Sequence, residues 1–230
     1  MIDKSINSWY MSAMMPLSKF NHERKDKEAI IFDAACRVIR KKGFHQARIT
    51  DIAQEAGISY GLVYHYFKSK TQLFDVILAE WWNGLFAKMD ECEATFDRVE
   101  DKLGALVAYF LDQYEKRPDL VHIFITEISR SSTNLTPPRL VYFKSFMDRV
   151  EGMIAQAQAE QAVRTDIKPR YLTYIFLGAV ETFVSTMVLE NHPLRGKNQK
   201  QRIAKSLLTV FFSGARPQPS HNEDRQWTSS

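Results

Sequence analysis

Hydroxyl, imidazole and basic side chains are concentrated between residues 48 and 70, and their spacing suits contacts with DNA. Ser59, Tyr60 and Gly61 open a short helical segment from which base edges in the major groove can be reached, and the missing Cβ of Gly61 lets the backbone come close. Neighbouring hydroxyl, ring-nitrogen and ammonium groups suit phosphate oxygens. The predicted DNA-binding set is Arg48, Thr50, Ser59, Tyr60, Gly61, Tyr64, His65, Tyr66 and Lys70.

The charge distribution favours a polyanionic partner for this part of the chain. Residues 19–70 hold 11 basic and six acidic side chains, whereas the whole chain of 230 residues has a net charge of +4. The window therefore carries +5 and the remainder about −1, so only the first part is suited to bind a polyanion. Two alternatives stay open: a charged face that is merely solvated, and a Tyr66 that packs in the core beside Val63 and Phe67.

Local patterns predict the helices that would position these side chains. Apolar residues from Ile31 to Ile39 repeat at helical spacing and indicate an amphipathic helix over residues 25–42. Gly43 is suited to the left-handed conformation beyond its end, with Phe44 folding back on Ile39 in a Schellman contact.

Two short helices and a longer one are expected next. Thr50 is the expected cap of a helix over residues 51–56, which Gly57 ends, and Ser59 caps a third helix over residues 60–67. Two short helices around a glycine-containing turn are the signature of a helix-turn-helix. Ser69 and Gln72 have the spacing of a capping box at the start of a fourth helix.

The run from Ile49 to Leu73, preceded by Gly43-Phe44, resembles the DNA-binding domain of TetR-type repressors. The resemblance covers about 45 residues and includes the turn glycine, the aromatic pattern and the Ser-Lys pair after the third helix. It departs from many members at Leu62, where threonine is common, which puts a phosphate contact there in doubt. The resemblance supports Thr50, Tyr64, Tyr66 and Lys70 as phosphate contacts, and it implies double-stranded operator DNA as a partner.

Beyond residue 71 no strand pattern or internal repeat occurs, so the predicted fold class is all-α: a three-helix DNA-binding domain followed by a helical ligand-binding and dimerisation domain. The predicted division is a flexible arm (1–22), the helix-turn-helix domain (23–70), the larger domain (71–214) and a disordered tail (215–230). Helices of the larger domain are expected at 72–96, 100–116, 119–131, 138–161, 168–190 and 200–214.

The segment 168–190 has apolar side chains on two sides, which predicts one face in the core and another against a second copy. Residues 200–214, including Phe211, are expected beside it. The TetR resemblance implies a homodimer held by these last two helices. A helix that is simply central in one domain is the alternative.

The middle helices combine aromatic side chains with a few polar groups, a composition that suits an apolar cavity for a small-molecule effector and equally suits an ordinary core. The predicted ligand-binding set is Phe110, Tyr114, Phe124, Glu127, Arg130, Tyr142, Phe146 and Phe183.

Two short stretches suggest what the effector is. Residues 126–134 and 178–188 are similar to a branch of the family that responds to fatty acyl-CoA, which makes such a compound the expected effector of a repressor released by its ligand. The alternative is a repressor of a drug efflux pump that senses cationic or aromatic compounds. Clustered acidic groups in the cavity would favour the second reading, and basic groups at its mouth the first.

Other classes of function are disfavoured by what the sequence lacks. The six histidines are scattered, and the chain shows no catalytic, nucleotide-binding or zinc motif, so we expect neither an enzyme nor a cofactor or metal site. Cys36 and Cys92 are far apart and read as reduced thiols. With no signal peptide or membrane-spanning run at its start, the chain is expected to be cytoplasmic and not membrane-bound.

Overall fold

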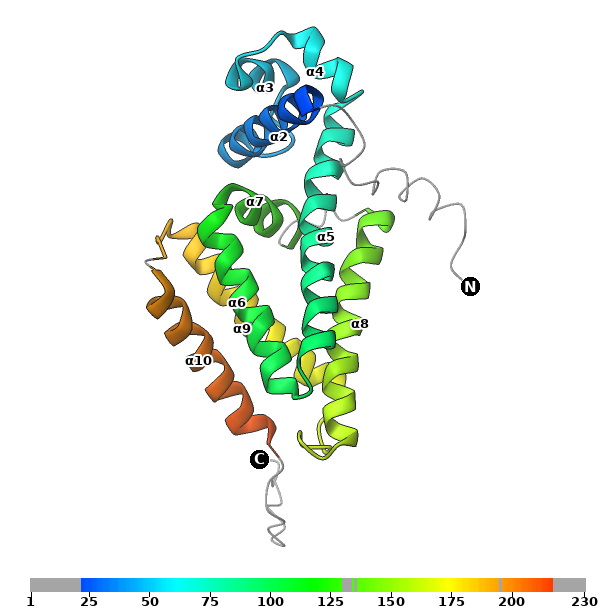
Figure 1. Ribbon diagram of the computed structural model, residues 1–230, viewed down its shortest axis with the longest axis vertical. Coiled ribbons are helices and arrows are strands. Elements are labelled where there is room, and N and C mark those ends of the chain that lie inside the picture. The colour runs from blue at the N-terminus through cyan, green and yellow to red at the C-terminus, as the bar shows by residue number, and fades with distance from the viewer. Residues whose placement is uncertain (1–21, 130–133, 135, 195, 217–230) are drawn as a thin grey trace, which may run out of the picture.

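The computed structural model describes residues 22–129, 134, 136–194 and 196–216, and these residues are helical with short connections (Figure 1). Within them no strand occurs, which agrees with the predicted all-α class. Most of the predicted arm and tail, and the ligand-site candidate Arg130, lie outside the described residues.

Three helices form one end of the molecule. They are α2 (His22–Lys42), α3 (Ile49–Ala56) and α4 (Tyr60–Tyr66). Ile31, Ile52 and Val63, one from each helix, have no exposed surface, so the predicted apolar stripe does form the core of this group. Helix α5 (Lys70–Thr95) begins beside it and runs the length of the rest of the molecule (Figure 1).

The caps of the short helices follow the predictions with one exception. Ser59 Oγ accepts from the Leu62 amide at 3.3 Å, and Ser69 Oγ accepts from the Gln72 amide at 3.0 Å. Helix α3 begins two residues earlier than expected: Arg48 is its N-cap, and Asp51 Oδ2 accepts from the Arg48 amide at 3.0 Å. The prediction of Thr50 as the cap was therefore wrong, because Thr50 already lies inside the first turn.

The larger body consists of α5, α6 (Val99–Lys116), α7 (Pro118–Ile123), α8 (Pro137–Ala159), α9 (Pro169–Leu189) and α10 (Gly196–Ala215). A single helix was predicted over 119–131, but α7 passes at Phe124 into a π-helical segment, η2 (Phe124–Ser129). Such wide turns are rare and are frequently found at functional sites. Helix α7 packs against α2, so this part of the body lies directly beneath the three-helix end (Figure 1).

Helix α9 has apolar residues all round. In the part of the chain that the structure describes, it alone is long and apolar enough to cross a membrane, with a mean hydropathy of 1.6. Half of that window is buried inside the protein, and α9 packs against α8 and α10. Its length and hydropathy are therefore explained in part by its position in the core.

Candidate functional site

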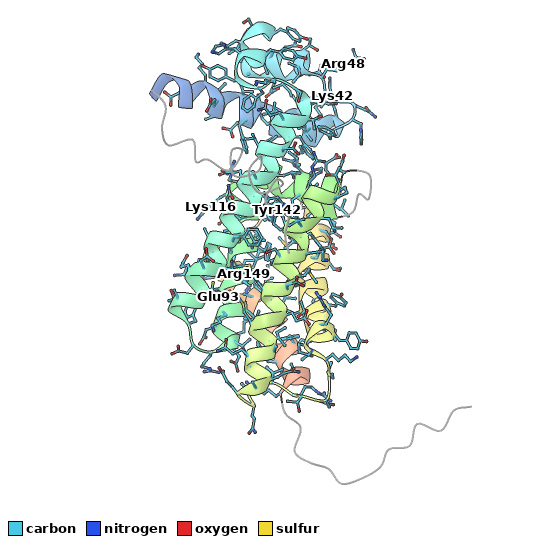
Figure 2. The ribbon with its side chains drawn as sticks, turned by 90° about the vertical axis from the view of Figure 1, so that its right-hand side faces the viewer. Lys42, Arg48, Glu93, Lys116, Tyr142 and Arg149 are labelled. Atoms are coloured by element: carbon cyan, nitrogen blue, oxygen red, sulfur yellow. The ribbon has the colours of Figure 1, made fainter. Side chains whose placement is uncertain are left out.

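The side chains predicted to contact DNA lie together on the outer surface of α3 and α4. Figure 2 shows Arg48 at the end of the molecule formed by α2–α4, far from Tyr142 in the body. Tyr60 and Tyr64 are 50% and 41% exposed although aromatic, and their rings meet edge to face at 4.9 Å. A side-chain hydrogen bond to Tyr64 raises the pKa of Tyr60 above its ordinary value. Both tyrosine side chains are thus presented to an outside partner.

The rest of the predicted DNA-binding set divides into exposed and half-buried members. Tyr66 and Lys70 are half-buried, and Tyr66 also packs against the core. Packing in the core therefore stays an alternative to a phosphate contact for Tyr66. Exposed members besides the tyrosine pair are Arg48, Thr50, Ser59, Gly61 and His65.

Lys70 has a different environment from the one predicted. Its Nζ donates to three backbone carbonyls, those of Phe44 at 2.8 Å, His45 at 3.1 Å and Ala47 at 3.0 Å. An ammonium group has three N–H donors, so all of them are used within the protein. Lys70 holds the turn between α2 and α3 in place, and this geometry leaves no donor for a phosphate.

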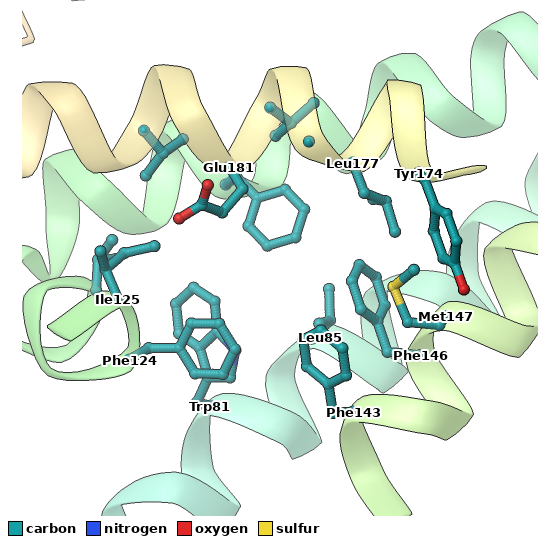
Figure 3. Close-up of a pocket in the computed structure, with 15 residues that line it drawn as sticks. Trp81, Leu85, Phe124, Ile125, Phe143, Phe146, Met147, Tyr174, Leu177 and Glu181 are labelled. Atoms are coloured by element: carbon teal, nitrogen blue, oxygen red, sulfur yellow. The ribbon is translucent and has the colours of Figure 1, made fainter. Parts of the chain in front are cut away.

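The body contains a cavity of about 360 Å³ between α5, α6, η2, α8 and α9 (Figure 3). This volume falls within the range of small-molecule sites. Glu181 is the one charged side chain among the described residues that line the cavity. Aromatic side chains form much of the wall: Trp81, Phe110, Phe124, Phe143, Phe146 and Tyr174.

Three residues of the predicted ligand-binding set, Phe110, Phe124 and Phe146, line this cavity. Trp81 and Leu85 on α5 were missed by the sequence analysis. Their spacing of four residues does place them on one helix face, but nothing in a single sequence says that this face borders a cavity.

Other members of that set lie elsewhere. The Tyr114 hydroxyl donates to the carbonyls of Met187 and His192 at 2.9 and 2.7 Å, which ties α6 to the end of α9. Tyr142 stacks on the Trp82 ring at 6.1 Å. Phe183 is on the outer side of α9 and 36% exposed. None of the three lines the cavity.

Glu127 points from η2 toward the three-helix end. Its Oε1 accepts from the backbone amide of Phe44 at 3.2 Å, and its Oε2 accepts from Asn134 Nδ2 at 2.8 Å. This carboxylate does not line the cavity. It joins the two parts of the protein.

The outer side of α9 and α10 is apolar and exposed. Ile175, Leu189 and Val210 are 57%, 61% and 76% exposed, although large apolar side chains are usually buried in a folded protein. Phe211, which we expected in the same surface, is instead 9% exposed and packs on Phe176 with ring centroids 5.2 Å apart. The surface that a second copy could cover is thus centred on Ile175 and Val210.

Comparisons with known proteins match most of the chain. The family model "Bacterial regulatory proteins, tetR family" matches residues 31–77, and the model "YsiA-like protein, C-terminal region" matches residues 79–210. The fatty acid metabolism regulator protein of Bacillus subtilis is 21% identical over 84% of this chain and 97% of its own length. The transcriptional repressor KstR2 of Rhodococcus jostii is 27% identical over 60% of this chain and 68% of its own.

Two solved structures share the fold. FadR from Bacillus subtilis, in complex with stearoyl-CoA, superimposes with a TM-score of 0.69 at 21% identity, over 81% of this chain and 98% of that one. AibR, in complex with isovaleryl coenzyme A and operator DNA, has a TM-score of 0.65 at 18% identity, over 81% of this chain and 98% of that one.

Proposed function

The chain belongs to the TetR family of bacterial regulatory proteins, and from this premise we infer that it is a repressor whose operator binding is released by an acyl-CoA-type ligand. As a member of the family it is a DNA-binding transcription regulator that acts as a dimer and is not an enzyme. The effector, the contact residues and the domain limits at 23–70 and 71–214 are our proposals. A regulator that binds operator DNA is expected in the cytoplasm.

For the DNA interface we propose that Tyr60 and Gly61 read bases. Both are exposed at the start of α4, the position from which a recognition helix reaches base edges. Arg48, Thr50 and Tyr64 are proposed to contact phosphates, because they flank this surface and are exposed. The carbonyl contacts of Lys70 support a role in shaping the surface instead.

The cavity is the observation that carries the effector proposal. Its lining is almost wholly apolar, so it would bind an acyl chain through burial of methylene groups, each worth about 0.8 kcal/mol. Glu181 alone does not form the cluster of acidic groups that a sensor of cationic drugs would need. The similar proteins named above that bind acyl-CoA compounds support the same choice.

The polar end of such a ligand needs basic groups outside the cavity. Arg139 on α8 is buried, and its Nη2 donates to Asp75 Oδ1 at 2.6 Å, so it is not available for this purpose. Lys144 is exposed on α8 and remains a candidate. The phosphates of an acyl-CoA head group at the protein surface are screened by solvent and salt, so a few basic side chains are enough to balance their charge.

The test measures operator binding with acyl-CoAs from C8 to C18 and with a panel of cationic drugs. The operator duplex is first selected from a random library with the full-length protein. We expect the affinity for the ligand to rise by about a hundredfold or more between C10 and C16, given the gain per methylene group. Release of DNA by the drugs at micromolar concentration, with none by any acyl-CoA, would show that the efflux reading is right.

A further inference from the structure

The π-helical segment η2 borders the ligand cavity on one side and the α2–α3 turn on the other. Phe124 and Ile125 line the cavity, and Glu127, in the same helical segment, bonds to Phe44 in the turn. Figure 3 shows Phe124 and Ile125 at one end of the cavity, opposite Tyr174 and Met147. Among the described residues, two elements both line the cavity and have a side-chain hydrogen bond to this turn. These are η2, through Glu127, and α5, through Lys70.

At the turn, the hydrogen bond from the Phe44 amide to Glu127 takes the place of a backbone hydrogen bond at the end of α2. The Gly43 amide donates to the Ile39 carbonyl at 2.7 Å, which closes α2 with a single left-handed cap. The Phe44 amide does not complete the expected Schellman pair and donates to Glu127 Oε1 instead. Phe44 is 8% exposed, so its amide depends on this carboxylate for a partner in the described structure.

The carboxylate is itself held on both sides. Asn134, which is 3% exposed, donates to Glu127 Oε2, and the Asn134 carbonyl accepts from Arg139 Nη1 at 2.8 Å. At the turn, Lys70 holds the Phe44 carbonyl while Phe44 stacks on Phe74 at 4.2 Å. The turn leads directly into Arg48, the N-cap of α3, so its position sets where the DNA-facing helices lie.

On the side of the cavity, Phe124 has little freedom to move alone. Its ring stacks on Trp81 with centroids 4.5 Å apart and meets Trp82 edge to face at 5.2 Å. A ligand that presses on Phe124 must therefore shift η2 as a unit.

The geometry points to Glu127 as the positioning residue through which occupancy of the cavity reaches the DNA-binding helices. In this structure Glu127 fixes the Phe44 turn, and a ligand that displaces Phe124 and Ile125 would withdraw the carboxylate from the Phe44 amide. The inference rests on the proposed function for the existence of an effector. It adds the path by which that effector acts.

The first experiment separates ligand binding from its effect on DNA. Palmitoyl-CoA is the probe, and operator affinity is measured by fluorescence anisotropy of the full-length protein with and without it. Glu127→Ala should bind palmitoyl-CoA as the wild type does, by calorimetry. The factor by which palmitoyl-CoA weakens operator binding should fall about tenfold, within the 5- to 150-fold span of ordinary coupling between sites.

Two variants are the matched controls. Glu127→Gln keeps an oxygen that can accept from the Phe44 amide, so it should retain most of the ligand effect. Glu91→Ala removes a glutamate whose partner is Lys88 on the surface of α5, and it should behave as wild type. A simple loss of stability in Glu127→Ala would reduce ligand binding and operator binding alike, and would not be rescued selectively by glutamine.

A second experiment needs no effector. Val180 lines the cavity and is 4% exposed, so Val180→Phe fills part of the space in place of a ligand. It should weaken operator binding by about fivefold or more in the wild-type background and by less than about twofold in the Glu127→Ala background.

The outcomes for the two proposals are distinct. If wild-type protein does not bind palmitoyl-CoA, the acyl-CoA proposal fails and the Val180→Phe pair decides the role of Glu127. If Glu127→Ala responds to palmitoyl-CoA as fully as wild type, or if Val180→Phe acts equally in both backgrounds or has no effect, Glu127 does not carry the coupling, whatever the effector is.

Discussion

At the scale of single residues, two charged side chains that the sequence suggested for ligands hold the chain together instead. Lys70 fastens three carbonyls of the α2–α3 turn, and Glu127 fastens the amide of the same turn. Lys70 Nζ makes three hydrogen bonds within the protein, and each carboxylate oxygen of Glu127 accepts one. The side chains free to meet DNA are the exposed ones on α3 and α4.

We predict that Lys70→Met destabilises the protein by about 2 kcal/mol, because three carbonyl acceptors lose a charged donor. Urea unfolding followed by circular dichroism measures this loss. The salt dependence of operator binding should stay as in wild type. Normal stability with a weaker salt dependence would instead assign Lys70 to a phosphate.

Arg48→Ala is expected to weaken binding to all DNA sequences by a similar factor. Arg48 is exposed beside the recognition surface, and removing one cation from a phosphate lowers the slope of log K against log salt by about 0.9. Tyr60→Ala should alter sequence preference and keep that slope. A changed preference in Arg48→Ala, measured by repeating the operator selection, would contradict this assignment.

His122 gives the protein a sensitivity to acid. Burial, with a smaller effect of Arg40, lowers the pKa of His122 below its ordinary value of 6.5, and its Nδ1 has no hydrogen-bond partner among the described residues. The folded state therefore favours the neutral imidazole. The free energy of unfolding is unaffected by His122 at pH values above the unfolded pKa, and it decreases as pH falls below about 6.5, because protonation of the ring then favours the unfolded state. Urea midpoints at several pH values should fall less steeply on acidification in His122→Leu than in wild type. Parallel curves would exclude His122 as the cause.

At the scale of elements, α9 has three different environments around its circumference. It walls the ligand cavity with Leu177 and Glu181, packs on α8 and α10, and exposes Ile175 on its outer side. An apolar surface of this kind is typical of an oligomer interface. This accounts for a hydropathy that by composition alone would suit a membrane helix.

Ile175→Glu and Val210→Glu should each convert the dimer to folded monomers. The introduced charge would be buried without a partner at the interface, yet both side chains are exposed in one subunit, so folding is spared. Sedimentation velocity and circular dichroism test this together. Phe211→Glu should unfold the protein because Phe211 packs inside the subunit. If both exposed-site variants stay dimeric, the interface lies on another face.

At the scale of the whole molecule, the cavity and the DNA surface lie in different parts of the chain that meet at α5, α7 and η2 (Figure 1). Besides Glu127, Arg40 on α2 bonds to Asp119 on α7 at 2.6 Å, so the contact has several points. A regulator needs such a contact, since a ligand that binds both arrangements equally shifts neither.

Reciprocity follows from this arrangement. If palmitoyl-CoA weakens operator binding by a given factor, saturating operator must weaken palmitoyl-CoA binding by the same factor, because both reflect one coupling free energy. Calorimetric titration of the ligand into free protein and into the protein–operator complex gives the two dissociation constants. An apparent dissociation constant that keeps rising with operator concentration, without reaching a plateau, would indicate that the ligand and DNA compete for one site.

Much of the architecture could be predicted from the sequence, because helix periodicity and caps depend on residues a few positions apart. The stripe around Ile31, the caps Ser59 and Ser69 and the left-handed Gly43 are properties of this kind. The exposed tyrosines of α4 also belong here, because Tyr60 and Tyr64 are four residues apart and so share one face of a short helix whose buried residue is Val63.

Tertiary packing decided the rest, because a side chain's partner on a distant helix depends on how the helices are rotated and stacked. Glu127 and Phe124 look alike to the sequence as cavity candidates, yet one faces the Phe44 turn and the other the cavity. Phe211 and Val210 are neighbours in an apolar run, but the first fills the core and the second lies outside. In α10 a one-residue step turns Val210 and Phe211 to different faces, whereas Phe124 and Glu127, three residues apart, are separated by the wide turn of the π-helical segment η2. Only the assembled bundle determines what each face meets.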